Sequence, residues 1–357
     1  MKVAYTDRTV LDAARERVAQ VFDRFPRVVV SVSGGKDSTV LRHLAVEEAA
    51  RRGRRVGLFF LDQEAEYQAT IDVIAEWMAD PRVDPAWYQV PVRMTNATSH
   101  RDYWLHAWGE GQPWMRPKHP LAIHRIDGPY PDRFYEFFPW IEAQDREPTA
   151  HLVGLRSRES FNRFRSVTKR AGCHGWRWST ATDNPHSYRC YPLFDWTTSD
   201  VWKYIADHAL TYNRHYDRMF AKYGAVDRKM RVSNLIHEKS FRCLADLQEF
   251  EPDTYDALVR RIGGPHAAAL YYDESGVFEA TDLPPTFPTW RAYRDYLLDT
   301  TPLDRVGRFR QRFAGQRVDE ETCRQQVKQI LLNDWENAVP VSQPKRNRLK
   351  ERLWDLL

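Results

Sequence analysis

The sequence predicts an α/β protein with a doubly wound, mostly parallel sheet, flanking helices and a mainly helical C-terminal extension. Three apolar runs indicate the sheet, and they cover residues 28–32, 56–61 and 151–155. Strands that are buried on both faces stay apolar throughout, as these runs do. A helical pattern separates the first two runs, and fewer than thirty residues lie between their starts. This spacing suits one right-handed βαβ unit.

The elements around the first two strands follow from the spacing of apolar residues. Residues 8–25 place apolar side chains at helical intervals, which predicts an amphipathic helix leading into the first strand. A second helix is expected from residue 38 to about residue 52, because glycine at position 53 is typical of the end of a helix. The pattern then predicts a helix at 71–78 and a third strand at 87–93.

Regular patterns fail between about residues 95 and 148. This stretch contains four tryptophans and four histidines, and the histidine spacings fit no familiar metal motif. We expect an irregular insertion that either closes over the site or docks a partner. Further on, Thr197 and Asp200 have the spacing of a capping box and predict the start of another helix.

The pattern changes again in the C-terminal part of the chain. Beyond about residue 245, helical stretches alternate with proline-rich connections, and one helix is expected at 320–335. The tail, residues 345–357, is a basic helix candidate whose charges either face solvent or contact a polyanion. We therefore expect two domains, residues 1–220 with the insertion and residues 221–357.

The composition is that of a globular protein, with 42% hydrophobic and 13% aromatic residues. No run approaches eighteen apolar residues and the N-terminus lacks an apolar signal core, so we expect a cytoplasmic protein. The net charge of +4 is modest, but residues 151–180 hold seven Lys or Arg residues against one Glu. Such a patch suits phosphates or a nucleic-acid backbone.

A short polar loop, Ser33-Gly34-Gly35-Lys36-Asp37-Ser38, connects the first strand to the next helix. Its two glycines let the backbone turn tightly and approach a ligand closely. A helix N-terminus then presents free N–H groups and a positive dipole end to an anion. Lys36 adds a cation, and Ser33 and Ser38 add hydroxyl donors. The ligand of this loop should therefore carry phosphates.

The loop lacks the spacing of the common phosphate-binding loop and of the dinucleotide fold. It resembles instead the pyrophosphate-binding loop of the PP-loop ATP pyrophosphatase superfamily, whose fold is adenine nucleotide α-hydrolase-like. This resemblance implies cleavage of ATP between the α and β phosphates. Members usually adenylate a substrate, so that a nucleophile can displace AMP. Residues 1–220 would then form the nucleotide-binding domain.

Further stretches resemble one branch of that superfamily, the phosphoadenosine phosphosulfate (PAPS) reductase group. They lie in the expected order within roughly residues 20–220, and they are 154–160, 192–196, 200–202 and 212–217. True reductases of the group carry a nucleophilic cysteine in a short Glu-Cys-Gly-x-His tail, whereas Cys323 lies in Glu-Thr-Cys-Arg. Reductase chemistry is therefore unsupported, and nucleotide activation remains.

The resemblance implies ATP and Mg²⁺ as cofactors. The loop residues expected to hold the β and γ phosphates are Ser33, Gly34, Gly35, Lys36, Asp37 and Ser38. Lys36 would offset charge as pyrophosphate leaves. Asp37, or Asp62 after the second strand, would hold Mg²⁺, which prefers carboxylate and phosphate oxygens in octahedral geometry.

Two arginines that follow the fourth strand complete the candidate catalytic set with Lys36 and Asp37. Arg156 and Arg158 would clamp the α phosphate or the acceptor. The alternative is a surface ion-pair network with Glu159. The sequence does not decide between these two interpretations.

The extension after residue 220 resembles the larger reductase-like proteins of mobile and defence loci. These are the DNA phosphorothioation proteins (Dnd and Ssp types) and the Ibr-type prophage co-activators, and residues 231–238 fit the Ibr-like and Ssp-like branch best. This resemblance implies activation of a DNA backbone phosphate for sulfur incorporation, with a cysteine desulfurase or a ParB-like protein as partner. The alternatives are a small-molecule sulfonucleotide or adenylating enzyme, and a nucleotide-binding regulator.

Sulfur transfer to DNA would need an accessible thiol as a relay. The four cysteines are far apart and form no Cys-x-x-Cys pair, so a locally built zinc or iron–sulfur site is not expected. Cys173 is the candidate relay, because neighbouring glycines should expose it and Lys169, Arg170 and His174 should lower its pKa. Alternatively, Cys173 is a bystander thiol, as most of the cysteines should be.

Overall fold

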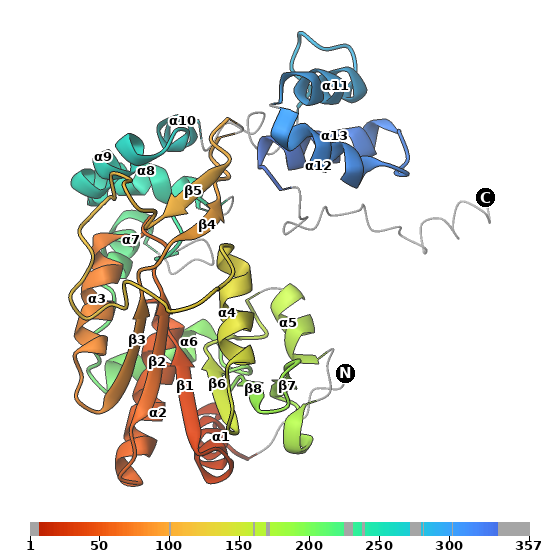
Figure 1. The fold of residues 1–357 in the computed structure, drawn as a ribbon. Helices are drawn as coiled ribbons and strands as arrows, with labels where there is room; N and C mark the ends of the chain where they lie inside the picture. Colours follow the sequence, from red (N-terminus) through yellow and green to blue (C-terminus); the bar gives the residue numbers. More distant parts are fainter. Residues whose placement is uncertain are drawn as a thin grey trace. The chain divides into compact units, whose positions relative to one another are not determined.

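The computed structural model describes residues 7–99, 101–159, 161–168, 172–224, 231–237, 240–271, 280, 282–301 and 303–334. Its central sheet contains six strands in the order β3-β2-β1-β6-β8-β7 (Figure 1). The bounds are β1 Arg27–Ser31, β2 Val56–Leu61, β3 Val83–Tyr88, β6 Thr149–Val153, β7 Ser179–Ala181 and β8 Ser187–Cys190. All neighbouring strands pair in parallel except β7 and β8. The predicted doubly wound, mostly parallel sheet is therefore confirmed.

The predicted third strand at 87–93 is wrong in its bounds. The chain forms β3 over Val83–Tyr88 and, after a break, β4 over Val92–Thr95. β3 lies at the edge of the sheet, and its Asp84 and Pro85 are exposed. An edge strand tolerates proline and polar residues, so it lacks the continuous apolar run that identifies the central strands.

Helices cover the sheet, and their apolar faces form one core with it. They include α1 Val10–Arg24, α2 Lys36–Arg51, α3 Gln68–Met78 and α6 Thr198–Asp207. α2 begins two residues before the expected start. The capping box of α6 is confirmed, because the Thr197 hydroxyl accepts from the Asp200 amide and the Asp200 carboxylate accepts from the Thr197 amide.

The stretch from 95 to 148 is only partly irregular. It contains β5 Trp104–Ala107, which pairs with β4, and α4 Phe134–Ala143. α4 holds Pro139 inside an aromatic sequence, and an internal proline is a poor helix signal. For this reason the sequence pattern missed the helix.

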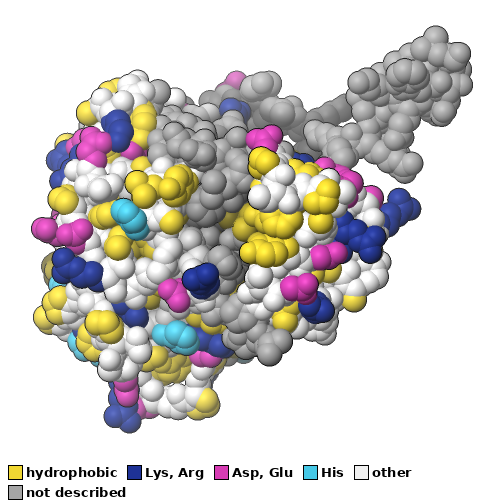
Figure 2. All heavy atoms as spheres, turned by 90° about the horizontal axis from the view of Figure 1, so that it is seen from above, with side chains coloured by type: hydrophobic (Ala, Val, Ile, Leu, Met, Phe, Trp, Pro, Cys, Tyr) yellow, Lys and Arg dark blue, Asp and Glu magenta, His cyan; other side chains and the backbone are white. Residues whose placement is uncertain are grey.

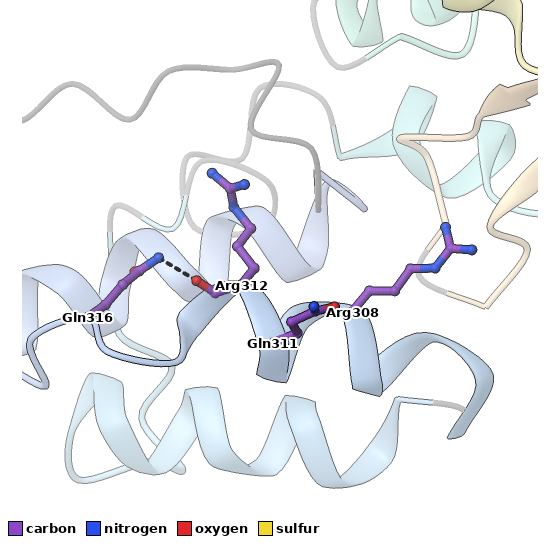
Figure 3. A pocket seen from close by; sticks show the side chains of 4 residues that line it. All are labelled: Arg308, Gln311, Arg312 and Gln316. Atoms are coloured by element: carbon purple, nitrogen blue, oxygen red, sulfur yellow. Dashed lines mark hydrogen bonds between the residues drawn. The ribbon is translucent and has the colours of Figure 1, made fainter.

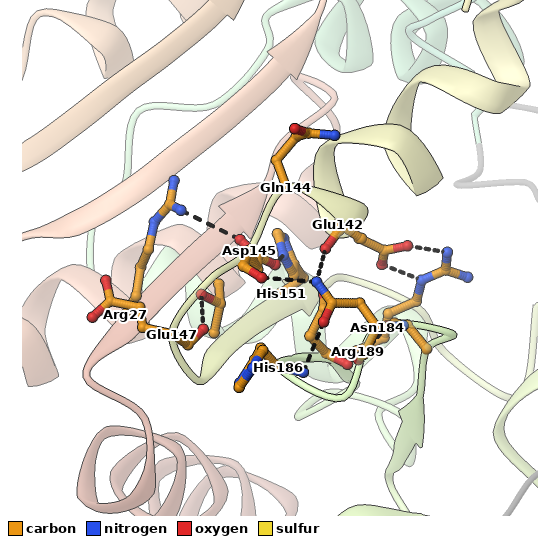
Figure 4. Close-up of polar contacts among 12 residues, drawn as sticks. Arg27, Glu142, Gln144, Asp145, Glu147, His151, Asn184, His186 and Arg189 are labelled. Carbon is orange, nitrogen blue, oxygen red and sulfur yellow. Dashed lines mark hydrogen bonds and ion pairs between the residues drawn. The ribbon is translucent and has the colours of Figure 1, made fainter. Parts of the chain in front are cut away.

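A polar network ties α4 to the strands β1, β6 and β8 (Figure 4). His151 lies 2.7 Å from the Asp145 carboxylate, and both side chains are buried. Burial alone would raise the pKa of Asp145, but the hydrogen bond and charge of His151, together with Ser187 and Arg27, outweigh burial and keep this pKa below its ordinary value. Arg189 pairs with Glu142 in a bidentate contact. Asp145 precedes β6, so this network braces the amino ends of the strands rather than their carboxyl ends.

The chain divides into two compact units. The first consists of residues 1–94, 105–235 and 243–261, and the second of residues 95–104, 236–242 and 262–357. Because these units interleave along the chain, the expected division at residue 220 stays a prediction.

The remaining helices belong mainly to one unit each. α5 Phe161–Thr168, α7 His215–Tyr223, α8 Phe241–Phe250 and α9 Pro252–Arg261 lie largely or wholly in the first unit. α10 Pro265–Leu270, α11 Trp290–Thr300, α12 Leu303–Phe313 and α13 Glu320–Leu331 lie in the second. The expected helical C-terminal region is confirmed, whereas the basic tail at 345–357 lies outside the described residues.

The core of the second unit is small and includes Tyr103, Leu297, Phe309, Val327 and Ile330. No helix among the described residues combines the length and the apolar character that crossing a membrane requires.

Candidate functional site

The loop that follows β1 lies at the point where the strand order of the sheet reverses. β1 is flanked by β2 on one side and by β6 on the other, and all three strands run in parallel. The carboxyl ends of β1 and β6 therefore open side by side. In open α/β sheets, this switch point is where ligands bind.

The two segments that leave β1 and β6 are packed tightly together. A Cβ atom on Gly154, just after β6, would lie 3.2 Å from the carbonyl carbon of Asp37 and 3.3 Å from the Ser38 nitrogen. Gly34 has a φ of +67°, and a Cβ atom there would lie 2.8 Å from the Thr70 methyl group. Close contact with the backbone therefore favours glycine at position 154, and at position 34 both the positive φ and a close contact favour it.

The loop leads directly into the N-terminus of α2. Gly35 is the N-cap residue and supplies no side-chain cap. The first-turn amides of such a helix lack intrahelical partners and suit an anion. The backbone at this helix N-terminus is therefore suited to a phosphate group, and phosphate binding by the loop stays a prediction.

Charged side chains gather at this helix N-terminus. The Lys36 ammonium lies 2.9 Å from one Asp37 oxygen, and the Arg156 Nε donates to the other. Burial lowers the pKa of Lys36, but interactions with Tyr216 and with Asp37 outweigh burial and raise it. Lys36 is therefore cationic at neutral pH. Asp37 holds two cations beside the loop in the place where a phosphate would be attracted.

The structure adds Tyr216, which was not among the predicted site residues. Its hydroxyl accepts a 3.3 Å hydrogen bond from the Lys36 amide, and its ring lies 5.8 Å from the Lys36 ammonium. No described residue accepts the Tyr216 hydroxyl proton. The motif at 212–217 marked this segment, but 180 residues separate Tyr216 from the loop, so only the fold reveals the contact.

The chain is similar to known protein families over most of its length. A model of the phosphoadenosine phosphosulfate reductase domain matches residues 27–231, more than half of the chain. The chain belongs to the PAPS reductase family. A second model, the domain of unknown function DUF3440, matches residues 224–318. The predicted membership in the PP-loop class and its PAPS reductase-like branch is confirmed, while the closer likeness to Ibr, Dnd or Ssp proteins stays a prediction.

Two curated relatives and one solved structure are similar to this chain. The chain is 29% identical over 321 residues to the uncharacterized protein YbdN of Escherichia coli K12, covering 85% of this chain and 78% of YbdN. It is 23% identical over 211 residues to adenosine 5'-phosphosulfate reductase of Oceanobacillus iheyensis, covering 58% of this chain and 73% of that enzyme. The PAPS reductase structure from Candida auris aligns with 12% identity and a TM-score of 0.31, over 64% of this chain and 97% of that one.

Within this PAPS reductase-like site, Ser38 does not play the expected part. Its hydroxyl donates to the Gly35 carbonyl at 2.8 Å and accepts from the Ser33 amide at 3.3 Å, and it is buried. Ser38 therefore shapes the loop from inside instead of offering its proton to a phosphate. Ser33, in contrast, is exposed.

The predicted Mg²⁺ role of Asp62 is not supported by the geometry. Asp62 is fully buried, and its oxygens accept four hydrogen bonds, from the Glu64 amide, Trp87, Gln89 and Arg116. Asp37 likewise has both oxygens engaged by cations. These carboxylates do not fit a resident Mg²⁺, and no cluster of three potential metal ligands occurs in the described part of the chain. A Mg²⁺ ion that arrives with ATP belongs to the substrate.

The two arginines after β6 differ in their surroundings. The Arg156 side chain is only 4% exposed and contacts Asp37 and, at 3.1 Å, Glu159. Glu159 also pairs with Arg163 at 2.6 Å. Arg158 is exposed and forms no ion pair with the described residues. Arg156 thus lies in the loop's charge cluster and also in the alternative ion-pair network, whereas Arg158 remains free for a ligand.

The expectation that glycines expose Cys173 is wrong. All four cysteines are buried, and Gly172 packs its α carbon against the Trp176 carbonyl group. The pKa of Cys173 is lowered to about 7, mainly by a hydrogen bond with Cys190 and further by Ser179, against the effect of burial. Lys169 and Arg170, to which the sequence reasoning attributed this effect, lie outside the described residues. A buried thiol cannot serve as an accessible relay in this conformation.

Two arginines of the predicted basic patch, Arg163 and Arg165, lie on α5. Arg163, Phe164 and Arg165 are exposed in one turn of this helix. Interleaved basic and aromatic side chains suit nucleic acid, where phosphates bind the cations and bases stack on the rings. On the face seen in Figure 2, basic side chains are scattered among acidic and apolar ones rather than gathered into one surface.

Proposed function

We propose that this chain is an ATP pyrophosphatase that cleaves ATP between the α and β phosphates to activate an acceptor. The observation that carries the proposal is the pair of cations, Lys36 and Arg156, held by Asp37 at the uncapped N-terminus of α2. Membership in the PAPS reductase family supports a nucleotide ligand at this position. The missing reductase cysteine favours activation over reduction.

In the proposed reaction, each residue of the loop has a role that follows from its position. The amides of Gly34, Gly35 and Lys36 would receive the β and γ phosphates, with the exposed Ser33 hydroxyl beside them. An acceptor oxygen would attack the α phosphorus, and the bond between phosphorus and the bridging oxygen would break. Lys36 would then compensate the negative charge that develops on the departing pyrophosphate. A preorganised donor of this kind typically contributes about 3–4 kcal/mol of transition-state stabilisation.

Arg156 would serve the α phosphate or the acceptor. Because its side chain is buried and held at two carboxylates, it needs little reorganisation when charge develops. Arg158 has an exposed side chain, so it suits the acceptor, which is the part of the ligand that differs between members of the superfamily. Asp37 positions both cations and offers no free oxygen of its own.

For the acceptor we propose a DNA backbone phosphate, activated for sulfur incorporation. The exposed Arg163, Phe164 and Arg165 of α5 support this choice, because phosphate contacts supply most non-specific affinity for nucleic acid. In the second unit, α12 forms a hollow of about 450 Å³ lined by Arg308, Gln311, Arg312 and Gln316 (Figure 3). Arginine and glutamine side chains offer N–H donors that suit phosphate oxygens.

The sulfur would come from a partner protein. Because Cys173 and the other three cysteines are buried, none of them presents a thiol at the surface. We therefore assign the persulfide to a partner such as a cysteine desulfurase.

The test is ATP turnover with identification of the products, for the wild-type chain and for Lys36→Ala, with and without DNA. We expect AMP and pyrophosphate from the wild type and their loss in the variant. Lys203→Ala is the matched control, because Lys203 is an exposed helix lysine paired only with Asp207. ADP and phosphate as products, or binding without turnover, would reject α–β cleavage.

The DNA proposal has a separate test. Replacing Arg163 and Arg165 by Gln should weaken DNA binding and reduce its salt dependence, since each lost phosphate contact lowers the slope by about one. DNA binding that is unaffected by these changes, together with turnover that a small acceptor stimulates, would favour the small-molecule enzyme instead.

A further inference from the structure

A second hollow opens on the first unit, beside the N-terminus of α3. It has a volume of about 500 Å³, and its walls come from the segment 64–72, from Met115 and Arg116, from Arg218 and from residues 250–257. None of the loop residues 33–38 lines it, and neither does Arg156. We refer to this hollow as the Glu66 pocket.

Glu66 is the unexplained group in this pocket. Its side chain is only 2% exposed, and one carboxyl oxygen accepts a 3.1 Å hydrogen bond from the Asn234 amide. The other oxygen, Oε1, is enclosed and has no partner in the described chain. Glu64 provides a contrast, because its two oxygens accept from Arg261 and from the amides of Trp108 and Met115. A buried oxygen without a donor normally marks a missing ligand or water.

The segment that holds Glu66 in place is the stretch singled out by the sequence at 231–238. Thr70 donates to the Val232 carbonyl, and the Leu235 amide donates to the Ala65 carbonyl at 3.2 Å. Asn234, between these two contacts, adopts a left-handed conformation with a φ of +58°. This stretch therefore holds one oxygen of the Glu66 carboxyl group, while Oε1 stays buried and without a partner in a residue that lines the pocket. Glu238 of the stretch lies outside the described residues.

The other walls of the pocket combine acidic side chains with apolar ones. Five acidic side chains line it against two arginines. Glu251 is already engaged, because it accepts from the Gln68 and Ala69 amides at 2.7 and 3.1 Å. Asp253 at the rim is exposed, and the Met115 and Phe250 side chains add apolar surface.

We propose that the Glu66 pocket binds a small primary alkylammonium compound, whose head group donates to Glu66 Oε1 and whose hydrocarbon chain lies along Met115 and Phe250. The acidic walls select a cation, and the apolar surface selects an organic cation over a metal ion. The described residues hold no set of three acidic, His or Cys ligands that would suit a metal. The proposal stands independently of the ATP reaction, because the two sites share no residue.

Such binding would change the protonation of Glu66. Burial and the negative charge of Asp62 raise the pKa of Glu66 to about 8, against the Asn234 amide and Arg116, so the free carboxyl is mostly protonated at neutral pH. A bound ammonium favours the ionised carboxylate. Binding should therefore release a proton and tighten as the pH rises from 6.5 to 8.5. The other charged groups around the pocket are Glu64, Asp72, Arg218, Glu251 and Asp253.

The test is calorimetric titration of the full chain with n-pentylamine, which stays protonated over this pH range, and with n-pentanol as the uncharged control. We expect saturable binding of the amine at one site, an affinity gain of about tenfold or more between pH 6.5 and 8.5, and proton release. Glu66→Gln keeps the shape of the neutral carboxyl group and should bind about tenfold or more weakly, with no pH dependence. Glu136→Gln, which changes an exposed glutamate on α4, should bind as the wild type does.

A second variant keeps the test decisive if Glu66→Gln folds poorly. Asp253→Asn changes only an exposed rim charge and should weaken amine binding by a few fold. Equal binding of pentylamine by the wild type and both pocket variants, or binding of pentanol as strong as that of pentylamine, would overturn the proposal. Loss of ATP turnover in Lys36→Ala without loss of amine binding would show that the two sites act separately.

Discussion

Replacement of Gly34 by alanine tests the conformation of the loop directly. Gly34 has a φ of +67°, and a new Cβ atom would lie 2.8 Å from the Thr70 methyl carbon. The left-handed conformation costs an alanine roughly 1–2 kcal/mol. Overpacking against a buried side chain typically adds about 1–3 kcal/mol. We therefore expect Gly34→Ala to lower the free energy of unfolding by roughly 2–5 kcal/mol.

Gly111→Ala separates the two contributions. Gly111 has almost the same φ, +69°, but no atom lies within 4 Å of its hypothetical Cβ. This variant should therefore lose only the conformational part, roughly 1–2 kcal/mol. The difference between the two alanine variants then measures the collision with Thr70.

Thr70→Ser provides the complementary control, because it removes the colliding methyl group and keeps the hydroxyl. That hydroxyl donates to the Val232 carbonyl and accepts from Asn213 at 2.8 Å. In the double variant with Gly34→Ala, the collision should disappear while the conformational cost remains. Urea unfolding of the wild type and of the four variants, with unchanged m-values, provides the measurement. If Thr70→Ser restores none of the lost stability, or if Gly34→Ala costs no more than Gly111→Ala, the close approach described for this loop is wrong.

Two further predictions concern the neighbours of the loop and of α7. Tyr216→Phe removes an intramolecular hydrogen bond worth about 1 kcal/mol, so it should lower the free energy of unfolding by about that amount in urea unfolding; an unchanged stability would contradict this. His215 is fully buried with neither ring nitrogen hydrogen-bonded, and burial lowers its pKa to about 4 from an unfolded value of about 6.5. The unfolded chain binds the proton first, so stability is present above pH 6.5 and falls as the pH drops, by about 2 kcal/mol at pH 5. His215→Leu should abolish that part of the loss in urea unfolding at the two pH values, and an unchanged pH dependence would contradict it.

The central strands and the loop could be predicted because their signals are local. Strands buried on both faces need continuous apolar sequence, and a turn with positive φ needs glycine, so neighbouring residues carry the information. The edge strand β3 is paired on one side only, and its exposed Asp84 and Pro85 break the pattern. The helix α4 was missed for a similar reason, since Pro139 is a local signal against a helix that its buried Phe137 helps to hold in place.

Side-chain roles at the site depend on partners far along the chain, and there the sequence was less informative. Asp62 follows a buried strand at the carboxyl edge of the sheet, which is where a metal ligand is expected. Its distant partners are Trp87, Gln89 and Arg116, 25 to 54 residues away, and together with the Glu64 amide they give its carboxylate four hydrogen bonds. Cys173 likewise lies between glycines that suggested exposure, yet the sheet brings Cys190 beside it.

The arrangement of Asp37 explains how one loop can hold cations ready without a bound phosphate. Two positive side chains at a helix N-terminus repel each other and the helix dipole, which would disperse them in the absence of an anion. Asp37 supplies the missing negative charge, with one oxygen for Lys36 and one for Arg156. An incoming phosphate group would compete with this carboxylate for the same donors. In the proposed reaction, this competition would weaken phosphate binding, but the donors would already be in position and would need less reorganisation when charge develops.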